Sequence, residues 1–131
     1  MDWKRKIVSL FLRMSEVPTI FANQLKKTTI MVKHIILWTL NPELSDEEKQ
    51  QVKRGIKDGL EGLVGKVPGL IDVKVVIDGR LASSNADVML DSTLESEAAL
   101  KAYAVHPDHV AVANGKVRPY TVQRSCLDYE F

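Results

Sequence analysis

The segment VKHIILWTL, residues 32–40, decides the fold because its pattern is that of a strand with two apolar faces. β-Branched and aromatic residues dominate it, and this composition predicts a β-strand. Because side chains alternate along a strand, one face carries His34, Ile36, Trp38 and Leu40, and the other carries Ile35, Leu37 and Thr39. Since both faces are apolar, we expect the sheet that contains this strand to be covered on both sides.

A helix is predicted after this strand. Ser45 and Glu48 have the spacing of a capping box, and acidic residues fill the first turn. An apolar stripe at helical spacing then continues to Val67-Pro68-Gly69, where we expect the helix to end. The helix contains three glycines, Gly55, Gly59 and Gly62. Each weakens a helix by about 1 kcal/mol relative to alanine, so we interpret them as points of close packing on a sheet.

Alternating patterns predict further strands at 71–77, 86–93 and 120–129, with helices at 96–105 and 107–115. In the first of these strands the buried face is predicted to carry Ile71, Val73, Val75 and Ile77. The order β-α-β-β-α-α-β is the ferredoxin-like pattern with a split last helix: an α+β fold with a four-stranded antiparallel sheet. Helices cover one face of such a sheet, so we predict a homodimer in which a partner's sheet covers the Ile35 and Leu37 face.

Length, charge and cysteine content limit the classes of protein to which this chain can belong. A length of 131 residues suits one globular domain, and the net charge of +1 gives no electrostatic case for nucleic acid binding. Residues 1–30 carry six Lys/Arg and two acidic residues, so we expect a basic extension, with an amphipathic helix at 3–14 and a linker, before a domain at 31–131. No apolar run is long enough to predict a membrane span. The single Cys126 excludes an internal disulfide and favours a reducing compartment, so we expect a cytoplasmic protein.

The segment YAVHPDHV, residues 103–110, is the strongest candidate for a functional site. Pro107 suits the first position of a helix, which places His106 just outside it and His109 in the first turn. The helix dipole disfavours an imidazolium there, so we expect a neutral His109 near Tyr103, a plausible proton-transfer pair. The alternative interpretation is structural, with His106 as a helix cap and His109 as a partly buried core residue.

Four segments together carry a resemblance to a known family: MVKHII at 31–36, ALKAYAVHPDHV at 99–110, VRP at 117–119 and LDYE at 127–130. They resemble the stress-responsive dimeric A/B barrel (Dabb) family. The resemblance spans nearly the whole domain and implies ferredoxin-like units paired into a dimeric α/β barrel, in agreement with the two-faced strand at 32–40.

The best-understood resemblance within that family is to a plant polyketide cyclase that closes an aromatic ring by aldol chemistry without a cofactor. It implies that His109 and Tyr103 are catalytic and that His34 lies in the cavity. We therefore expect one mostly apolar cavity and no cofactor. The ligand-binding residues are expected to be His34, Ile36, Trp38, Leu90, His106, Val110 and Tyr120.

Three functional hypotheses follow from these residues. The first is an enzyme acting on a small apolar carbonyl compound, with His109 as base and Tyr103 as the group that polarises or protonates an oxygen. The second is a non-catalytic dimer that binds a small ligand or protects other proteins under stress. The third, least favoured, is a metal site made by His34, His106, His109 and Asp108. Cys126 lies within a predicted strand, and nothing in the sequence around it indicates the lowered thiol pKa of a reactive cysteine.

Overall fold

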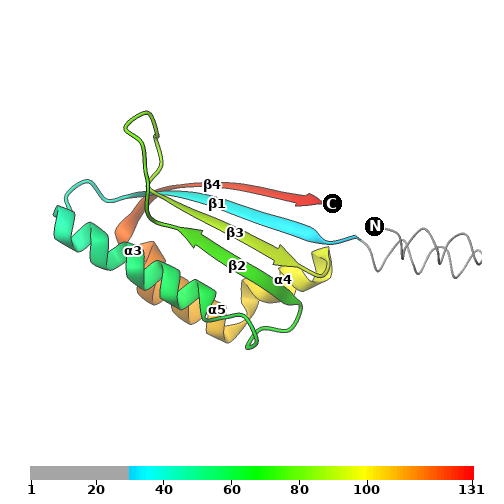
Figure 1. Cartoon of the computed structure of the whole chain (residues 1–131). Helices are drawn as coiled ribbons and strands as arrows, with labels where there is room; N and C mark the ends of the chain where they lie inside the picture. Colours follow the sequence, from blue (N-terminus) through cyan, green and yellow to red (C-terminus); the bar gives the residue numbers. More distant parts are fainter. Residues whose placement is uncertain (1–29) are drawn as a thin grey trace, which may run out of the picture. The chain divides into compact units, whose positions relative to one another are not determined.

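A computed structural model describes residues 30–131, which form a four-stranded antiparallel sheet with helices on one face (Figure 1). The elements are β1 (Val32–Leu40), α3 (Asp46–Glu61), β2 (Leu70–Val76), β3 (Val88–Leu94), α4 (Glu97–Val105), α5 (Pro107–Val112) and β4 (Thr121–Glu130). The strand order is β2-β3-β1-β4. The predicted ferredoxin-like fold is confirmed. The predicted helix at 3–14 lies outside the described residues, as does the linker up to residue 29.

Strand β1 lies within the sheet, between β3 and β4. Its register sets Ile36 opposite Leu90 of β3 and opposite Cys126 of β4. The opposite face of β1 is open in the single chain, where Leu37 is 40% exposed. The residues that face the helices are all buried: His34, Ile36, Trp38 and Leu40.

Helix α3 begins as predicted and ends early. The Ser45 hydroxyl accepts a hydrogen bond from the Glu48 amide at 3.1 Å, which satisfies one of the free N–H groups of the first turn. The helix ends at Glu61, so the predicted extension to Val67 is wrong. The chain turns instead through Gly65, whose φ of +87° is a left-handed conformation that glycine adopts without steric cost. Val67 is nevertheless buried, so the apolar stripe marked the core beyond the end of the helix.

Strand β2 contains an irregularity that shifts its alternation. Its register with β3 changes between Leu70 and Asp72, which leaves Ile71 as an extra residue. A bulge of this kind adds one residue to the strand, so the alternation of side chains between the two sheet faces is shifted by one residue beyond it. Ile71 is therefore 44% exposed, and its predicted place on the buried face is wrong. Val73 and Val75 are buried as predicted.

The segment before the last strand contains two short helical turns that were not predicted. Helix α5 ends at Val112, short of the predicted 115, and is followed by a π-helical turn, Ala113–Val117, and a 3₁₀ turn, Arg118–Tyr120. Strand β4 begins at Thr121, one residue later than predicted. Pro119 lies in the 3₁₀ turn, where its missing N–H removes no hydrogen bond from the sheet.

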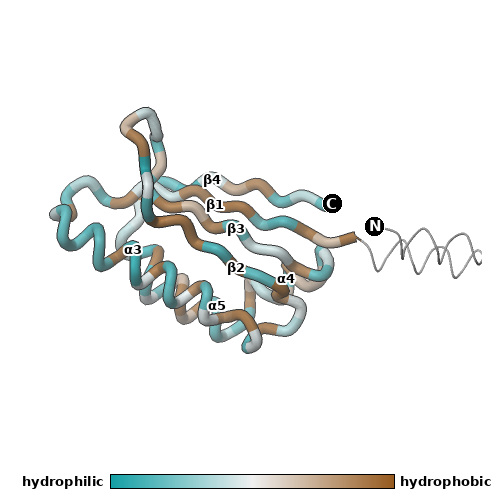
Figure 2. Tube along the Cα trace, in the orientation of Figure 1, coloured by the Kyte–Doolittle hydropathy of each residue, from teal (hydrophilic) through white to brown (hydrophobic). Residues whose placement is uncertain are grey.

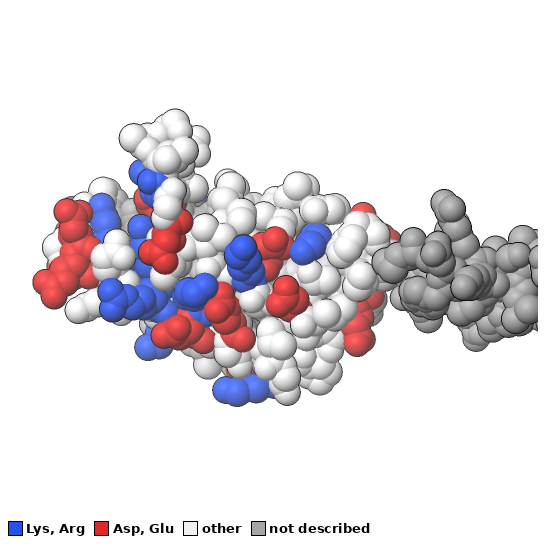
Figure 3. Space-filling model, in the orientation of Figure 1, with Lys and Arg blue, Asp and Glu red and all other residues white. Residues whose placement is uncertain are grey.

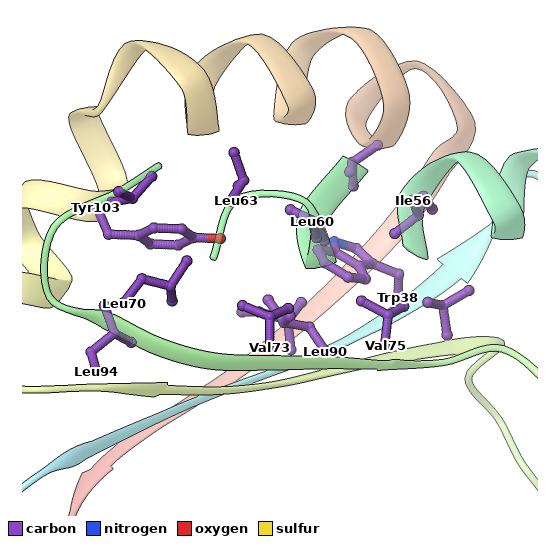
Figure 4. Packing of buried hydrophobic residues seen from close by; sticks show 14 of the residues in the cluster. Trp38, Ile56, Leu60, Leu63, Leu70, Val73, Val75, Leu90, Leu94 and Tyr103 are labelled. Atoms are coloured by element: carbon purple, nitrogen blue, oxygen red, sulfur yellow. The ribbon is translucent and has the colours of Figure 1, made fainter. Parts of the chain in front are cut away.

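The hydrophobic core fills the layer between the sheet and the helices (Figure 4). Apolar residues gather along the strands, in brown in Figure 2, whereas much of α3 is hydrophilic. Strand residues such as Val75 and Leu90 face Ile56 and Leu60 of α3, and all four are almost fully buried. Burial of a side chain of this size contributes about 1.5–3 kcal/mol relative to exposure. This single layer therefore holds α3 against the sheet.

Two glycines permit close approaches between elements. A Cβ atom at Gly59 would lie 2.8 Å from Cγ1 of Val112, so this glycine lets α3 approach α5. Our interpretation that it packs on the sheet is wrong. Gly69 has a φ of +82°, and a Cβ atom there would lie 2.6 Å from Cβ of Ala99. Gly69 therefore sets how closely the turn before β2 approaches the start of α4, the helix that carries Tyr103.

The sheet face away from the helices carries exposed apolar side chains. Leu127 of β4 pairs with Ile35 of β1, so the two share this face with Leu37. Leu127 is 61% exposed, and Tyr129 at the next position of the same face is 44% exposed. This is the face on which a partner's sheet is predicted to lie.

Candidate active site

A cavity of about 210 Å³ lies between the inner face of the sheet and the helices. The strands contribute His34, Ile36, Trp38, Leu90, Thr121 and Arg124. The helices and the turn after α5 contribute Leu60, Leu100, Tyr103, Ala104, His109, Ala113, Val117 and Arg118. An apolar cavity of about 150 Å³ holds a benzene molecule, so this one suits a ligand of one ring and a small substituent.

The break between α4 and α5 brings Tyr103 and His109 together. His106 is extended at this break, with φ −64° and ψ 132°, a conformation favoured before proline. Its Nδ1 accepts a hydrogen bond from the Asp108 amide at 3.1 Å and so caps α5. The rings of Tyr103 and His109 then pack against each other in a tilted arrangement, with centroids 4.1 Å apart and an angle of 36° between their planes.

His109 is held as a neutral base. Its Nδ1 lies 3.3 Å from the Ala104 carbonyl oxygen, which can only accept, so Nδ1 carries the proton and Nε2 has the free lone pair. Burial lowers the pKa of His109, and the positive charges of Arg118 and Arg124 act in the same direction, against the hydrogen bond to Ala104. The imidazole is therefore neutral at pH 7, as expected from its place in the first turn of the helix.

The Tyr103 hydroxyl is buried and has no hydrogen-bond partner within residues 30–131. Its side chain is 1% exposed, and Figure 4 shows the hydroxyl pointing into the layer between the sheet and the helices. Burial raises the pKa of Tyr103 to about 12, so the hydroxyl remains protonated at neutral pH. An unpaired buried hydroxyl costs about 1–3 kcal/mol, and such groups in native proteins call for an explanation.

His34 makes a third polar contribution from the sheet. Asp128 lies opposite it in the β1–β4 register, and the Asp128 carboxylate accepts a hydrogen bond from His34 Nδ1 at 2.5 Å. This bond orients the imidazole, whose ring centroid is 6.1 Å from that of Tyr103 in an edge arrangement. Asp128 belongs to the LDYE segment, but its pairing with His34 depends on strand register and was not predicted.

One group of side chains in the described part of the chain could hold a metal ion. His34, Cys126 and Asp128 each offer a ligand atom, and these atoms lie within 4.8 Å of one another. Burial, together with the Asp128 charge, raises the pKa of the Cys126 thiol, which opposes the thiolate that metal binding requires. Among the residues considered for a metal site from the sequence, His106 already uses its Nδ1 to accept the hydrogen bond that caps α5.

The sequence of the folded domain matches one family model. Residues 32–131 match the stress responsive A/B barrel domain. The chain belongs to the stress responsive A/B barrel domain family. The predicted family is thereby confirmed. No curated protein sequence matches the chain at the significance required.

Solved structures place this A/B barrel domain among ferredoxin-like proteins. A dimeric protein of unknown function from Bacteroides fragilis is 32% identical, with a TM-score of 0.72, over 77% of this chain and 96% of that one. A dimeric ferredoxin-like protein of unknown function from Thermobifida fusca is 25% identical, with a TM-score of 0.64, over 78% and 92%. A hydroxynitrile lyase from Passiflora edulis is 18% identical, with a TM-score of 0.60, over 77% and 93%. The lyase shares the fold.

The A/B barrel domain brings some of the predicted site residues together and leaves others apart. His34, Ile36, Trp38, Leu90, Tyr103 and His109 all line the cavity. Its lining does not include His106, Val110 or Tyr120. His106 is the cap of α5, and Tyr120 lines a separate hollow beside α3. The function of each of these residues stays a prediction.

The two arginines of the cavity lining were not predicted from the sequence. Arg124 lies opposite Trp38 in the β1–β4 register, on the inner face of β4. Arg118 lies in the turn that leads into β4 and belongs to the VRP segment. The alternation of β4 placed Arg124 on a face with Cys126, but only the register shows that this face meets the cavity.

The described residues include no helix that is long and apolar enough to cross a membrane. On the face drawn in Figure 3, acidic and basic side chains are interspersed over α3 and its surroundings. This mixture of signs is typical of a solvated surface.

Proposed function

We propose that the cavity of this A/B barrel domain carries out cofactor-free acid–base chemistry on a small, mainly apolar carbonyl compound. One observation carries this proposal: in the lining of one cavity, the ring of Tyr103, whose buried hydroxyl has no partner among residues 30–131, packs against the neutral imidazole of His109. A bound carbonyl oxygen would supply the hydrogen-bond acceptor that the Tyr103 hydroxyl lacks among the described residues.

In the proposed step, Nε2 of His109 removes a proton from the carbon next to the carbonyl. The C–H electron pair becomes the double bond of an enolate, and the carbonyl π electrons move to the oxygen. The Tyr103 hydroxyl donates a hydrogen bond to this oxygen, where negative charge develops. Return of the proton, or attack of the enolate on a second carbonyl group, completes an exchange or an aldol reaction.

The rest of the lining would bind and orient the ligand. Ile36, Trp38 and Leu90 present an apolar surface, as small-molecule sites usually do. We assign His34 to ligand binding, because Asp128 holds its ring close to Tyr103. We assign His106 to the α5 cap rather than to the ligand.

The shared fold is compatible with this class of chemistry. The Passiflora edulis protein of the same fold is a hydroxynitrile lyase, and at 18% identity it shows only that the fold is shared. The neighbours from Bacteroides fragilis and Thermobifida fusca have no known function. The proposal therefore rests on the cavity of this chain.

The test is exchange of the α-protons of phenylacetone in deuterated buffer, followed by proton NMR. We expect catalysed exchange by the native chain and a loss of about 10²–10⁴-fold in His109→Ala, the range for removal of a general base. His106→Asn is the matched control, because asparagine is also a good helix cap, and its rate should be unchanged. Exchange that is equal in the native chain and in His109→Ala would refute the proposal.

The alternative is a non-catalytic dimer that binds a small ligand in the same cavity or protects other proteins. The open apolar face of the sheet, with Leu37, Leu127 and Tyr129, supports dimer formation under either proposal. Neighbours of the same fold are described as dimeric. Ligand binding without exchange would favour this alternative.

A further inference from the structure

The cavity has an excess of positive charge. Arg118 and Arg124 are the permanently charged residues of its lining, and no Asp or Glu of the described chain belongs to that lining. Neither arginine forms an ion pair with a carboxylate within residues 30–131. The ion pairs found there use Lys33, His34, Lys57, Arg80 and Lys101.

Each arginine is positioned to meet a ligand at the edge of the cavity. Arg118 donates a hydrogen bond from Nη1 to Oδ1 of Asn114 at 2.5 Å, a neutral partner that steadies the guanidinium without neutralising it. Arg124 stands beside Trp38 on the sheet and lines both the cavity and the adjoining open hollow along β4. The nearby acid on that strand face, Asp128, is hydrogen-bonded to His34.

The chemistry of the arginine side chain points to its partner. A guanidinium presents a planar set of N–H donors that matches the two oxygens of a carboxylate or a phosphate. The deeper wall of the cavity is apolar, with Trp38, Leu60 and Leu90. The lining thus combines an apolar pocket for a small carbon skeleton with two unpaired cations where the cavity meets the outside.

We propose that the ligand of this cavity is a small apolar molecule with an oxyanion group, a carboxylate or a phosphate, which Arg118 and Arg124 bind. This inference rests on the proposed function in that it names the ligand class of the same cavity. The oxyanion lies at the arginines, and the apolar body lies against Trp38 and toward Tyr103 and His109. Because the charge is met by arginines, His109 remains neutral and free to act as a base.

Isothermal titration calorimetry tests this inference with three ligands of one shape class: phenylacetate, phenyl phosphate and the neutral phenylacetamide. We expect at least one anion to bind about tenfold or more tightly than the amide. Arg124→Gln and Arg118→Gln should each remove most of this preference, and added salt should weaken anion binding. The relative affinities of the two anions distinguish a carboxylate from a phosphate ligand.

Arg54→Gln is the matched control, because it removes the same charge from an exposed position of α3 outside the cavity lining. It should bind the anions as the native chain does, and thermal melting shows whether each variant is folded. Equal affinity for the amide and the anions, no measurable binding of either anion, or an unchanged preference in folded Arg124→Gln and Arg118→Gln would overturn the inference. The assay needs no turnover, so anion binding without proton exchange would refute the catalytic proposal and leave this one standing.

Discussion

The ring of Tyr103 lies against the ring of His109, with centroids 4.1 Å apart, although the two residues belong to different helices. The chain break at His106-Pro107 produces this contact, since it ends α4 just after Tyr103 and starts α5 just before His109. A buried phenol and a neutral imidazole thereby share one cavity wall. The predictions below test what each group does there.

Replacing Tyr103 by phenylalanine should stabilise the fold while it impairs function. The hydroxyl is buried without a partner among the described residues, so its removal relieves a desolvation cost, and we expect a gain of about 1 kcal/mol. The apolar ring and its packing on His109 are retained. Urea denaturation measures the stability, and a loss of more than about 1 kcal/mol would show that the hydroxyl is paired in the native protein.

The pKa of His109 should lie below its ordinary value of 6.5, because burial and the neighbouring arginines disfavour the imidazolium. The unfolded chain then binds the proton more readily than the folded chain. Folding stability due to this group is therefore fully present above pH 6.5 and is lost as the pH falls through the lowered folded-state pKa. NMR titration of the histidine ring protons measures this pKa directly.

Arg124→Gln provides the matched comparison for that titration. Loss of its positive charge should raise the pKa of His109, whereas Arg54→Gln, outside the cavity lining, should leave it unchanged. A His109 that titrates above 6.5 in the native chain would contradict the account of a buried neutral base.

The chain should form a homodimer through the sheet face that carries Ile35, Leu37 and Leu127. Leu37→Glu would place a charge in the middle of this apolar face, so it should shift the protein toward monomer. Val64→Glu is the control, because Val64 is equally exposed, at 41%, but follows α3 and is not part of the sheet. Light scattering that gives a mass of 14.7 kDa for the native chain at micromolar concentration would disprove the dimer.

Gly69→Ala should destabilise the domain more than Gly65→Ala. Both glycines have positive φ angles, so each substitution strains the backbone by about 1–2 kcal/mol. Only the new Cβ at Gly69 would meet a neighbour, Cβ of Ala99 at 2.6 Å, which pushes on the start of α4. We expect the overlap to cost an additional 1–3 kcal/mol or so in denaturant unfolding. Equal costs for the two substitutions would show that α4 moves freely away from Gly69.

Local patterns in the sequence were sufficient for the fold and for part of the cavity. Alternation along residues 32–40 placed His34 and Trp38 on the buried face because strand side chains have a fixed period. The proline in the histidine motif placed His109 in the first turn of a new helix. Each of these inferences used residues that are close together in the chain.

The remaining features depend on relationships between distant segments. Arg124 and Asp128 reach the site through the register of β4 on β1, and His34 and Asp128 are 94 positions apart in the sequence. The exposure of Ile71 follows from a bulge in the pairing of β2 with β3. The approach of α3 to α5 at Gly59 depends on how two helices pack. No pattern within a single segment specifies these pairings.

The central claim is that Tyr103 and His109 act on one bound carbonyl group, and the carbon NMR signal of carbonyl-labelled phenylacetone tests it most directly. A hydrogen bond from Tyr103 should polarise the carbonyl and move its signal downfield on binding to the native chain. Tyr103→Phe should bind the ligand without this shift, and His109→Ala should retain the shift while it loses proton exchange. A bound signal with the same position in the native chain and in Tyr103→Phe, or no bound signal at all, would contradict the claim.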